Sequence, residues 1–180
     1  MRVLKMKAGP LIERILRVNH AGESAAVYIY RGQLRGLKNN PEKRELIYEM
    51  MKTEQKHLQF FHSQIIQLRA RPTILLGVWK GIAFGVGYLS AKAGIQVAMS
   101  CTAAIEDTID RHYQKQIKFL TKVKPNEPQL LEKIVQFHQE EVEHKDIGLA
   151  NEAKKAPFHS IITGVVSLGC RVGIFIAEKI

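Results

Sequence analysis

The stretch Glu141-Val142-Glu143-His144 decides the fold of this 180-residue chain, together with an earlier counterpart, Glu54-Gln55-Lys56-His57. In both, a glutamate precedes a histidine by three residues, and on a helix of about 3.6 residues per turn the two side chains share one face. Apolar residues recur on the same faces, so both pairs are predicted to point into the core. A buried carboxylate costs several kcal/mol unless it is paired, and a divalent or trivalent metal ion suits Glu and His together.

Two further glutamates occupy the apolar faces of predicted helices. Glu23 belongs to a helix that is predicted from Pro10 to about Gly36, and Glu106 to one from about Ala93 to Lys122. The Glu-x-x-His pairs follow in the next helix of each half, so the chain repeats itself. Each half reads as a helix with Glu, a turn, a helix with Glu-x-x-His, and an apolar helix.

The predicted turns bring the glutamates and histidines to similar heights. Glu23 precedes Asn39, at the first turn, by about as many positions as the first Glu/His pair follows it. Glu106 likewise precedes Pro125, at the second turn, by about as many positions as the second pair follows it. Both helices of a hairpin rise about 1.5 Å per residue, so residues equidistant from the turn sit level. Two such hairpins packed face to face would bring four Glu and two His together.

One Glu from each of two helices plus Glu-x-x-His from each of the other two is the ligand set of ferritin-like di-iron and di-manganese proteins. A single Glu-x-x-His is usually a solvated pair, but two pairs on apolar faces, each matched by a buried Glu, favour a metal site. The predicted metal ligands are Glu23, Glu54, His57, Glu106, Glu141 and His144. No alternating strand pattern occurs. The predicted fold is therefore all-α, a single domain over residues 1–180 formed by a ferritin-like four-helix bundle with two additional apolar helices.

The two additional helices, predicted at Thr73–Leu89 and from Phe158 to about Glu178, are apolar and carry glycines. In the first, Gly77, Gly81 and Gly85 recur at four-residue intervals, a spacing that lets helices approach closely. This helix is either a core helix with a glycine packing face, or an interfacial helix or apolar wall for the substrate. Charged residues interrupt the apolar runs, and a membrane-crossing helix needs about 20 residues, so no span is predicted. Whether either helix is partly immersed in a membrane stays open.

Charge and cysteine content limit the possible binding partners and the cellular compartment. Lys and Arg number 27 against 17 Asp and Glu, a formal net charge of +10. A basic surface suits anionic lipids or nucleic acid, and charge alone does not choose between them. Cys101 and Cys170 are isolated and are predicted to be free thiols in a reducing compartment. The basic segment Met1–Ala8 lacks a long apolar run, so no signal peptide is predicted.

Four stretches around the predicted ligands carry a further signal, and two contexts within them, His20-Ala21-Gly22-Glu23 and Asp146-Ile147-Gly148-Leu149, are far more specific than the ligand spacing alone. The four stretches are Asn19-His20-Ala21-Gly22-Glu23, Glu54-Gln55-Lys56-His57-Leu58, Cys101-Thr102-Ala103-Ala104-Ile105-Glu106 with His112-Tyr113, and Glu140-Glu141-Val142-Glu143-His144 with Asp146-Ile147-Gly148-Leu149. With them the sequence resembles the demethoxyubiquinone hydroxylases of ubiquinone biosynthesis over nearly the whole chain.

The resemblance implies a ferritin-like bundle with a carboxylate-bridged di-iron site, two iron ions per chain held by the six predicted ligands. Such enzymes use O₂ and two electrons to hydroxylate the ring of a polyprenylated demethoxyquinone or quinol. His112 and Tyr113 match residues near the family's site. No dinucleotide fold is predicted, so the external reductant is either a partner protein or NADH meeting a bound quinone.

The same resemblance implies a peripheral membrane protein. Its expected partners are a polyprenylated quinone, a membrane surface with anionic lipids and a lipid-binding biosynthetic protein, with homo-oligomers allowed and no nucleic acid. The lack of an N-terminal extension favours a bacterial protein on the cytoplasmic face of the inner membrane. A eukaryotic protein would lie on the matrix side of the mitochondrial inner membrane.

Three other functions are alternatives to this one. A ferritin-like protein that oxidises and stores iron would use the same bundle but would show polar outer helices. A di-iron tRNA hydroxylase is suggested by the net charge. A non-catalytic membrane scaffold would leave six ligand-competent core residues unexplained.

Other polar residues carry weaker signals. His20, three residues before Glu23, is predicted to support the ligands or to pack in the core. Asp110, one turn after Glu106, is a candidate to orient a ligand histidine through its ring N–H. The remaining histidines are interpreted as ordinary exposed or helix-end residues: His62, His138 and His159.

Overall fold

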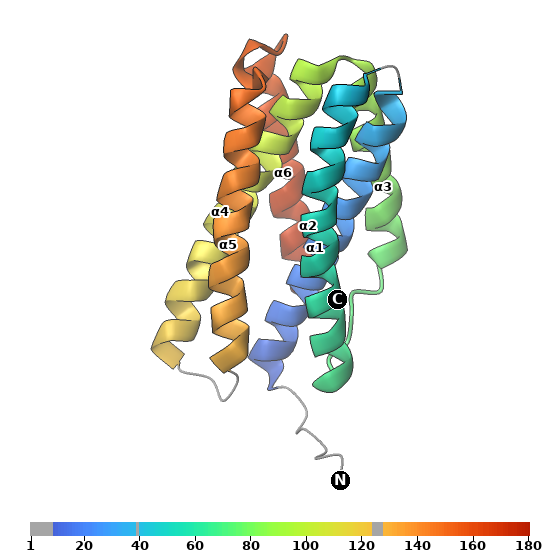
Figure 1. The fold of residues 1–180 in the computed structure, drawn as a ribbon. Coiled ribbons are helices and arrows are strands. Elements are labelled where there is room, and N and C mark those ends of the chain that lie inside the picture. The colour runs from blue at the N-terminus through green and yellow to red at the C-terminus, as the bar shows by residue number, and fades with distance from the viewer. Residues whose placement is uncertain (1–8, 39, 124–127) are drawn as a thin grey trace. The chain divides into compact units, whose positions relative to one another are not determined.

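The computed structural model describes residues 9–38, 40–123 and 128–180, and Figure 1 shows its fold. The helices among these residues are α1 (Pro10–Gly36), α2 (Pro41–Gln67), α3 (Leu76–Lys92), α4 (Ile95–Val123), α5 (Pro128–Ala150), the short 3₁₀-helix η1 (Ala153–Lys155) and α6 (His159–Ala177). No strand occurs in the described residues. The all-α prediction is therefore confirmed, and the helices are consistent with a ferritin-like bundle.

The helices form two compact units. The first extends to Lys92 and includes Val172–Ile180, and the second comprises Ala93–Arg171. In the first unit α1 packs against both α2 and α3, and in the second α4 packs against α5, with η1 against both. Each unit thus contains one of the two predicted hairpins. That the whole chain is a single domain stays a prediction.

Local sequence explains where the helices of the first hairpin begin. Pro10 and Pro41 each lie in the first turn of their helix, where the missing N–H would have had no partner within the helix. The side chain of Asn40 accepts a hydrogen bond from the backbone N–H of Lys43 at 3.2 Å, which caps α2. Asn39 and Pro125, at which the two turns are predicted, lie outside the described residues.

Glycines let α1 and α3 touch through their backbones. A Cβ added to Gly87 would overlap the backbone carbonyl of Ile29, and one added to Gly32 would overlap that of Phe84. Gly87 shares its face of α3 with the buried Ala83. Only residues without a side chain, or with a very small one, allow this distance between the two helices.

The glycines at four-residue intervals do not form the packing face of α3 that one of the two alternatives requires. Nothing lies within 4 Å of the Cβ position of Gly77, Gly81 or Gly85. These glycines are exposed or half-buried, because the face that meets α1 is the one with Gly87. The two alternatives left open for this helix both hold in part, since one face of α3 packs in the core and another is exposed and apolar.

The two ends of α6 contact different units. Near its C-terminal end, Arg17 of α1 donates hydrogen bonds to the backbone carbonyls of Ala177 at 2.7 Å and Glu178 at 2.8 Å. These carbonyls have no partner within the helix, so the guanidinium supplies one. Near its N-terminal end, Nδ1 of His159 lies 2.8 Å from Oγ of Ser100 on α4. The division between the units falls within α6.

Both cysteines are free thiols, as the sequence predicts. Cys101 is buried in α4 and Cys170 is half-buried in α6. Burial, together with the negative charge of Glu106, raises the pKa of the Cys170 thiol to about 12. This thiol is therefore protonated and unreactive near neutral pH.

Replacing Gly87 tests the close packing of α1 and α3. We expect Gly87→Ala to lower the free energy of unfolding by about 1–3 kcal/mol, because the new methyl group overlaps backbone atoms of Ile29. Gly81→Ala is the matched control, since nothing lies near its Cβ position and alanine's helix propensity should add up to about 1 kcal/mol. Urea denaturation followed by circular dichroism measures both. Equal stability of the two variants would contradict the packing described.

Candidate metal centre

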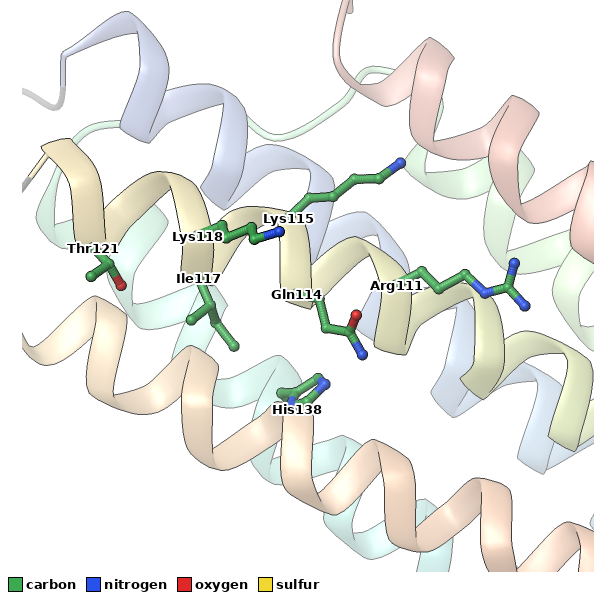
Figure 2. Close-up of a pocket in the computed structure, with 7 residues that line it drawn as sticks. All are labelled: Arg111, Gln114, Lys115, Ile117, Lys118, Thr121 and His138. Carbon is green, nitrogen blue, oxygen red and sulfur yellow. The ribbon is translucent and has the colours of Figure 1, made fainter.

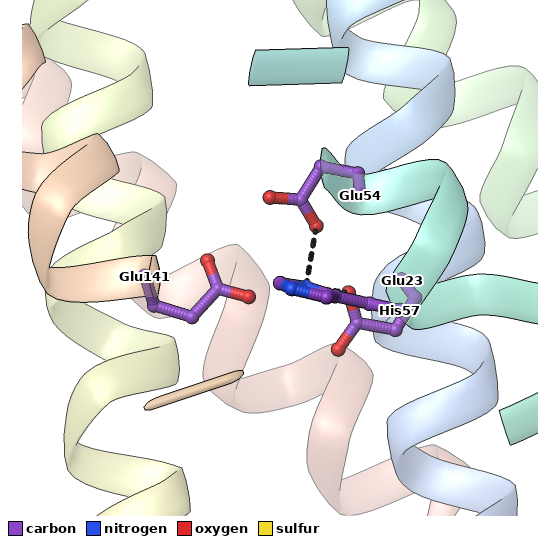
Figure 3. Close-up of side chains that lie close together, drawn as sticks. All are labelled: Glu23, Glu54, His57 and Glu141. Carbon is purple, nitrogen blue, oxygen red and sulfur yellow. Dashed lines mark ion pairs between the residues drawn. The ribbon is translucent and has the colours of Figure 1, made fainter. Parts of the chain in front are cut away.

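The first unit buries two carboxylates and one imidazole together. Glu23 comes from α1, and Glu54 and His57 come from successive turns of α2. One ligand atom of each lies within 4.8 Å of the others. Nδ1 of His57 is 3.5 Å from Oε2 of Glu23 and 3.7 Å from Oε2 of Glu54, and Figure 3 shows the three side chains converging. Each residue is at most 4% exposed, so this cluster offers three metal-ligating atoms away from solvent.

The second unit holds an equivalent cluster. Glu106 comes from α4, and Glu141 and His144 come from successive turns of α5. One ligand atom of each again lies within 4.8 Å of the others, and Nδ1 of His144 is 3.9 Å from Oε2 of Glu141. All three residues are buried. Two carboxylates and an imidazole form a donor set that suits a divalent transition metal such as iron.

A glycine lets α5 approach α4 beside the second cluster. Gly148 follows His144 by about one turn of α5. A Cβ added to Gly148 would lie 3.2 Å from the carbonyl oxygen of Met99 and 3.3 Å from Cβ of Ala103, which leaves no room for a larger side chain. The close approach of the two helices holds the second Glu/His pair near Glu106.

Burial controls the protonation of the first cluster. It raises the pKa of Glu23 to about 7, and the hydrogen bond from His57 offsets only part of this effect. The negative charge of Glu54 also raises the pKa. A bound metal ion would replace the proton, so metal affinity should increase with pH.

The raised pKa of Glu23 predicts how the metal-free protein responds to pH. Between the ordinary value of 4.5 and about 7, the folded protein holds a proton that the unfolded chain has released. The stabilisation that this proton provides is complete below pH 4.5 and is lost as the pH rises through the raised pKa of about 7. We expect the free energy of unfolding of chelator-treated protein to fall by on the order of 2 kcal/mol from pH 5 to 7.5.

Glu23→Gln should remove most of this loss, because an amide does not titrate. Urea unfolding at several pH values measures the slope for both proteins. The same slope in the variant would assign the pH dependence to other groups.

The two residues implied to lie near the site differ in their surroundings. Tyr113 is 1% exposed and follows Glu106 by two turns on the same face of α4. His112 is half-buried, with Nε2 at 2.7 Å from Nε2 of Gln116. Burial lowers the pKa of His112 to about 4, and the charge of Lys115 contributes. Their participation in chemistry stays a prediction.

Asp110 contacts none of the predicted ligand histidines in the described part of the chain. Its carboxylate lies 2.7 Å from Nε2 of His138, accepts a hydrogen bond from Gln114 at 2.6 Å and binds Lys145 at 3.1 Å. Burial alone would raise the pKa of Asp110, but the hydrogen bonds from Lys145 and His138 hold it below its ordinary value. His138 thus links α5 to α4 and is not the ordinary surface residue expected from the sequence.

Two further histidines are in contact in the structure, which the sequence did not predict. His62 of α2, interpreted from the sequence as an ordinary surface residue, places Nδ1 at 3.4 Å from Nε2 of the buried His20 of α1. No sequence signal links these residues, because they lie on different helices 42 positions apart. The contact depends on how α1 and α2 pack.

A groove of about 670 Å³ lies on the second unit outside the ligand cluster. Figure 2 shows its lining side chains on α4 together with His138 of α5. The lining is basic and polar: Arg111, Gln114, Lys115, Ile117, Lys118, Thr121 and His138. Three cationic side chains suit an anionic group and disfavour a metal ion.

Comparison with known proteins identifies the family. Residues 10–177 match the family model described as Ubiquinone biosynthesis protein COQ7. The chain belongs to the COQ7 family. A human relative, named NADPH-dependent 3-demethoxyubiquinone 3-hydroxylase, mitochondrial, is 38% identical over 170 residues, which cover 94% of this chain and 78% of that protein.

Relatives from a bacterium and a yeast are similar to the chain over the same range of coverage. A protein of Rhodospirillum rubrum named 3-demethoxyubiquinol 3-hydroxylase is 39% identical over 170 residues, 94% of this chain and 79% of that protein. A Saccharomyces cerevisiae protein named 5-demethoxyubiquinone hydroxylase, mitochondrial, is 32% identical over 182 residues, 94% and 78% of the two chains. The resemblance drawn from the motifs around the ligands is therefore confirmed.

Proposed function

We propose that this protein is a di-iron monooxygenase that uses O₂ to hydroxylate the ring of a polyprenylated demethoxyquinone or quinol in ubiquinone biosynthesis. The observation that carries the proposal is that a member of the COQ7 family buries two equivalent Glu/Glu/His clusters, one in each hairpin. The relatives' names supply the reaction and the substrate class.

The six clustered residues would hold two iron ions between them: Glu23, Glu54, His57, Glu106, Glu141 and His144. Four carboxylates and two imidazoles are the donor set of ferritin-like di-iron proteins. Iron, when bound, supplies the activation of O₂. The protein would supply the rest, since the ligands are buried away from water and Nδ1 of His57, 3.5 Å from Oε2 of Glu23, helps to orient that carboxylate.

The substrate ring and the reductant complete the proposal. We place the ring along α4 near Tyr113 and His112, because Tyr113 is buried on the face of Glu106. The two electrons would come from a reduced nicotinamide dinucleotide, as the human relative is named NADPH-dependent. NADH, one of the two sources that the sequence leaves open, provides the same hydride.

Exposed apolar side chains on α6 fit a substrate that resides in a membrane. Five of them recur at alternating intervals of four and three residues, which places them on one face of the helix. They are Ile161, Val165, Leu168, Val172 and Phe175, each 47–66% exposed. A face of this kind on the surface marks an interaction with lipid or protein.

The exposed face of α3 has the same character. Val78, Ile82, Val86 and Leu89 repeat at helical spacing and are 37–67% exposed. Their helix is held to α1 through Gly87, so the apolar face is presented by a packed element. We propose that α3 and α6 each bind the membrane interface.

Among the described helices, α6 is the one that is long and apolar enough to cross a bilayer. The sequence alone predicts no span, because Arg171 interrupts the apolar run. We favour a helix lying in the interface, because Arg17 binds its C-terminal carbonyls and its exposed apolar residues follow one face.

The proposed location follows from the substrate. A bacterial protein would lie on the cytoplasmic face of the inner membrane, and a mitochondrial one on the matrix side, as the eukaryotic relatives are named mitochondrial. A lipid-binding biosynthetic partner and a homo-oligomer remain predictions from the family. Iron storage and tRNA hydroxylation are less well supported, because the relatives are named demethoxyubiquinone or demethoxyubiquinol hydroxylases.

A direct assay with a ligand variant tests the activity. Iron-loaded protein supplied with a short-chain demethoxyquinol, O₂ and NADPH should give the hydroxylated ring by mass spectrometry. We expect Glu141→Ala to bind fewer than the roughly two iron ions per chain of the wild type and to lose activity by on the order of 100-fold or more. The exposed neighbour Glu143 provides the matched control, and Glu143→Ala should retain both the iron content and the activity of the wild type. No product from wild-type protein with full iron would contradict the function.

Vesicle binding tests the membrane proposal separately. We expect the double variant Val165→Asp with Leu168→Asp to bind anionic vesicles at least about tenfold more weakly, because two apolar side chains leave the interface. Gln55→Asp with Gln59→Asp adds the same charge to exposed positions of α2 and should bind nearly as well as the wild type. Cosedimentation measures both. Equal losses would mean that net charge, and not the α6 face, governs binding.

A further inference from the structure

The proposed reaction consumes protons as well as electrons. One atom of O₂ enters the ring C–H bond and the other leaves as water, which takes two electrons and two protons. A reduced nicotinamide supplies both electrons and one proton as hydride, so one proton must come from solvent. Because both ligand clusters are buried, this proton needs a route through the protein.

We propose that His62 and His20 relay this proton from solvent to the Glu23 side of the first cluster, a role that rests on the proposed function. His62 is exposed, and its Nδ1 lies 3.4 Å from Nε2 of His20, which is 4% exposed. The ring planes differ by 28° and the ring centroids are 5.5 Å apart. Since the nitrogens are much closer than the centroids, the rings meet nitrogen to nitrogen and not face to face.

The inner nitrogen of His20, Nδ1, is placed to release a proton toward the first cluster. Nδ1 of His20 is buried and has no hydrogen-bond partner in the described part of the chain, which is rare for a buried polar atom. Glu23 follows His20 by three residues on α1, so the two side chains share a face about one turn apart. One bridging water can span such a separation.

The step moves one proton and no electrons. Solvent adds a proton to Nε2 of His62, Nδ1–H of His62 passes its proton to Nε2 of His20, and Nδ1 of His20 releases one inward. An imidazole can do this because one nitrogen accepts while the other donates. Both rings end neutral in the opposite tautomer, and rotation of each ring returns its nitrogens to their starting roles.

The charges around His20 favour this neutral route. Burial lowers the pKa of His20 to about 4, with contributions from His62 of α2 and Lys80 of α3. The part of α6 that packs near this region of α1 adds apolar side chains, Ile174 and Ala177. His20 therefore conducts a proton without holding it, and the same basic surroundings disfavour a metal ion between the two rings.

Replacement of His62 tests the relay, because an exposed side chain can be changed without disturbing the core. We expect His62→Gln to keep the iron content and KM of the wild type and to lower kcat by about tenfold, with a larger solvent deuterium isotope effect. Added imidazole should restore kcat in this variant. His138→Gln is the matched control, because His138 bonds to Asp110 in the other unit, and neither kcat nor imidazole response should change.

The metal-free protein offers a readout that does not need turnover. In ¹⁵N-histidine-labelled protein, the Nδ1 proton of His20 should exchange with solvent about tenfold more slowly in His62→Gln, and imidazole should restore the rate. Loss of the His20 ring proton signal in His20→Gln assigns it. If fully iron-loaded wild-type protein makes no product, the proposed function fails and this exchange alone judges the relay. Unchanged exchange in His62→Gln, or unchanged kcat and isotope effect in an active enzyme, overturns it.

Discussion

The constraint on which this structure depends is the burial of two carboxylates and one imidazole inside each helical hairpin. Such groups are costly in an apolar core unless they share protons, hydrogen bonds or a metal ion. The raised pKa of Glu23 is a direct sign of that cost. A bound cation would compensate this cost, and the proposed pair of iron ions would account for the same three donors in both hairpins.

The glycines serve this constraint from outside the clusters. Gly148 lets α5 lie close to α4 beside the second Glu/His pair, and Gly87 with Gly32 lets α3 lie against α1. In both cases the backbone itself forms the contact, so the helices cannot slide without losing it. In the second unit, Gly148 thereby keeps α4 and α5 close enough for ligand atoms of Glu106, Glu141 and His144 to lie within 4.8 Å of one another.

The polar and apolar groups are distributed in an unusual way. Ionisable side chains occupy the interior of each hairpin, whereas α3 and α6 expose continuous apolar faces. The proposed substrate, with a polar ring and a long hydrocarbon tail, would use both environments. The paired histidines His20 and His62 add a third feature, a polar contact between the buried side of α1 and solvent.

Helical periodicity alone determined which residues can ligate metal and which helices carry them, because i and i+3 share a face whatever surrounds the helix. Motif identity around Glu23 and Glu141 was enough to determine the family. Only the tertiary structure decided which face of a helix meets which neighbour. In the structure Gly87, and none of the regularly spaced Gly77, Gly81 and Gly85, packs against α1. Asp110 contacts His138, and His20 contacts His62. The physical reason is that such contacts depend on the rotation and height of two separate helices, which packing sets and sequence spacing within one helix does not.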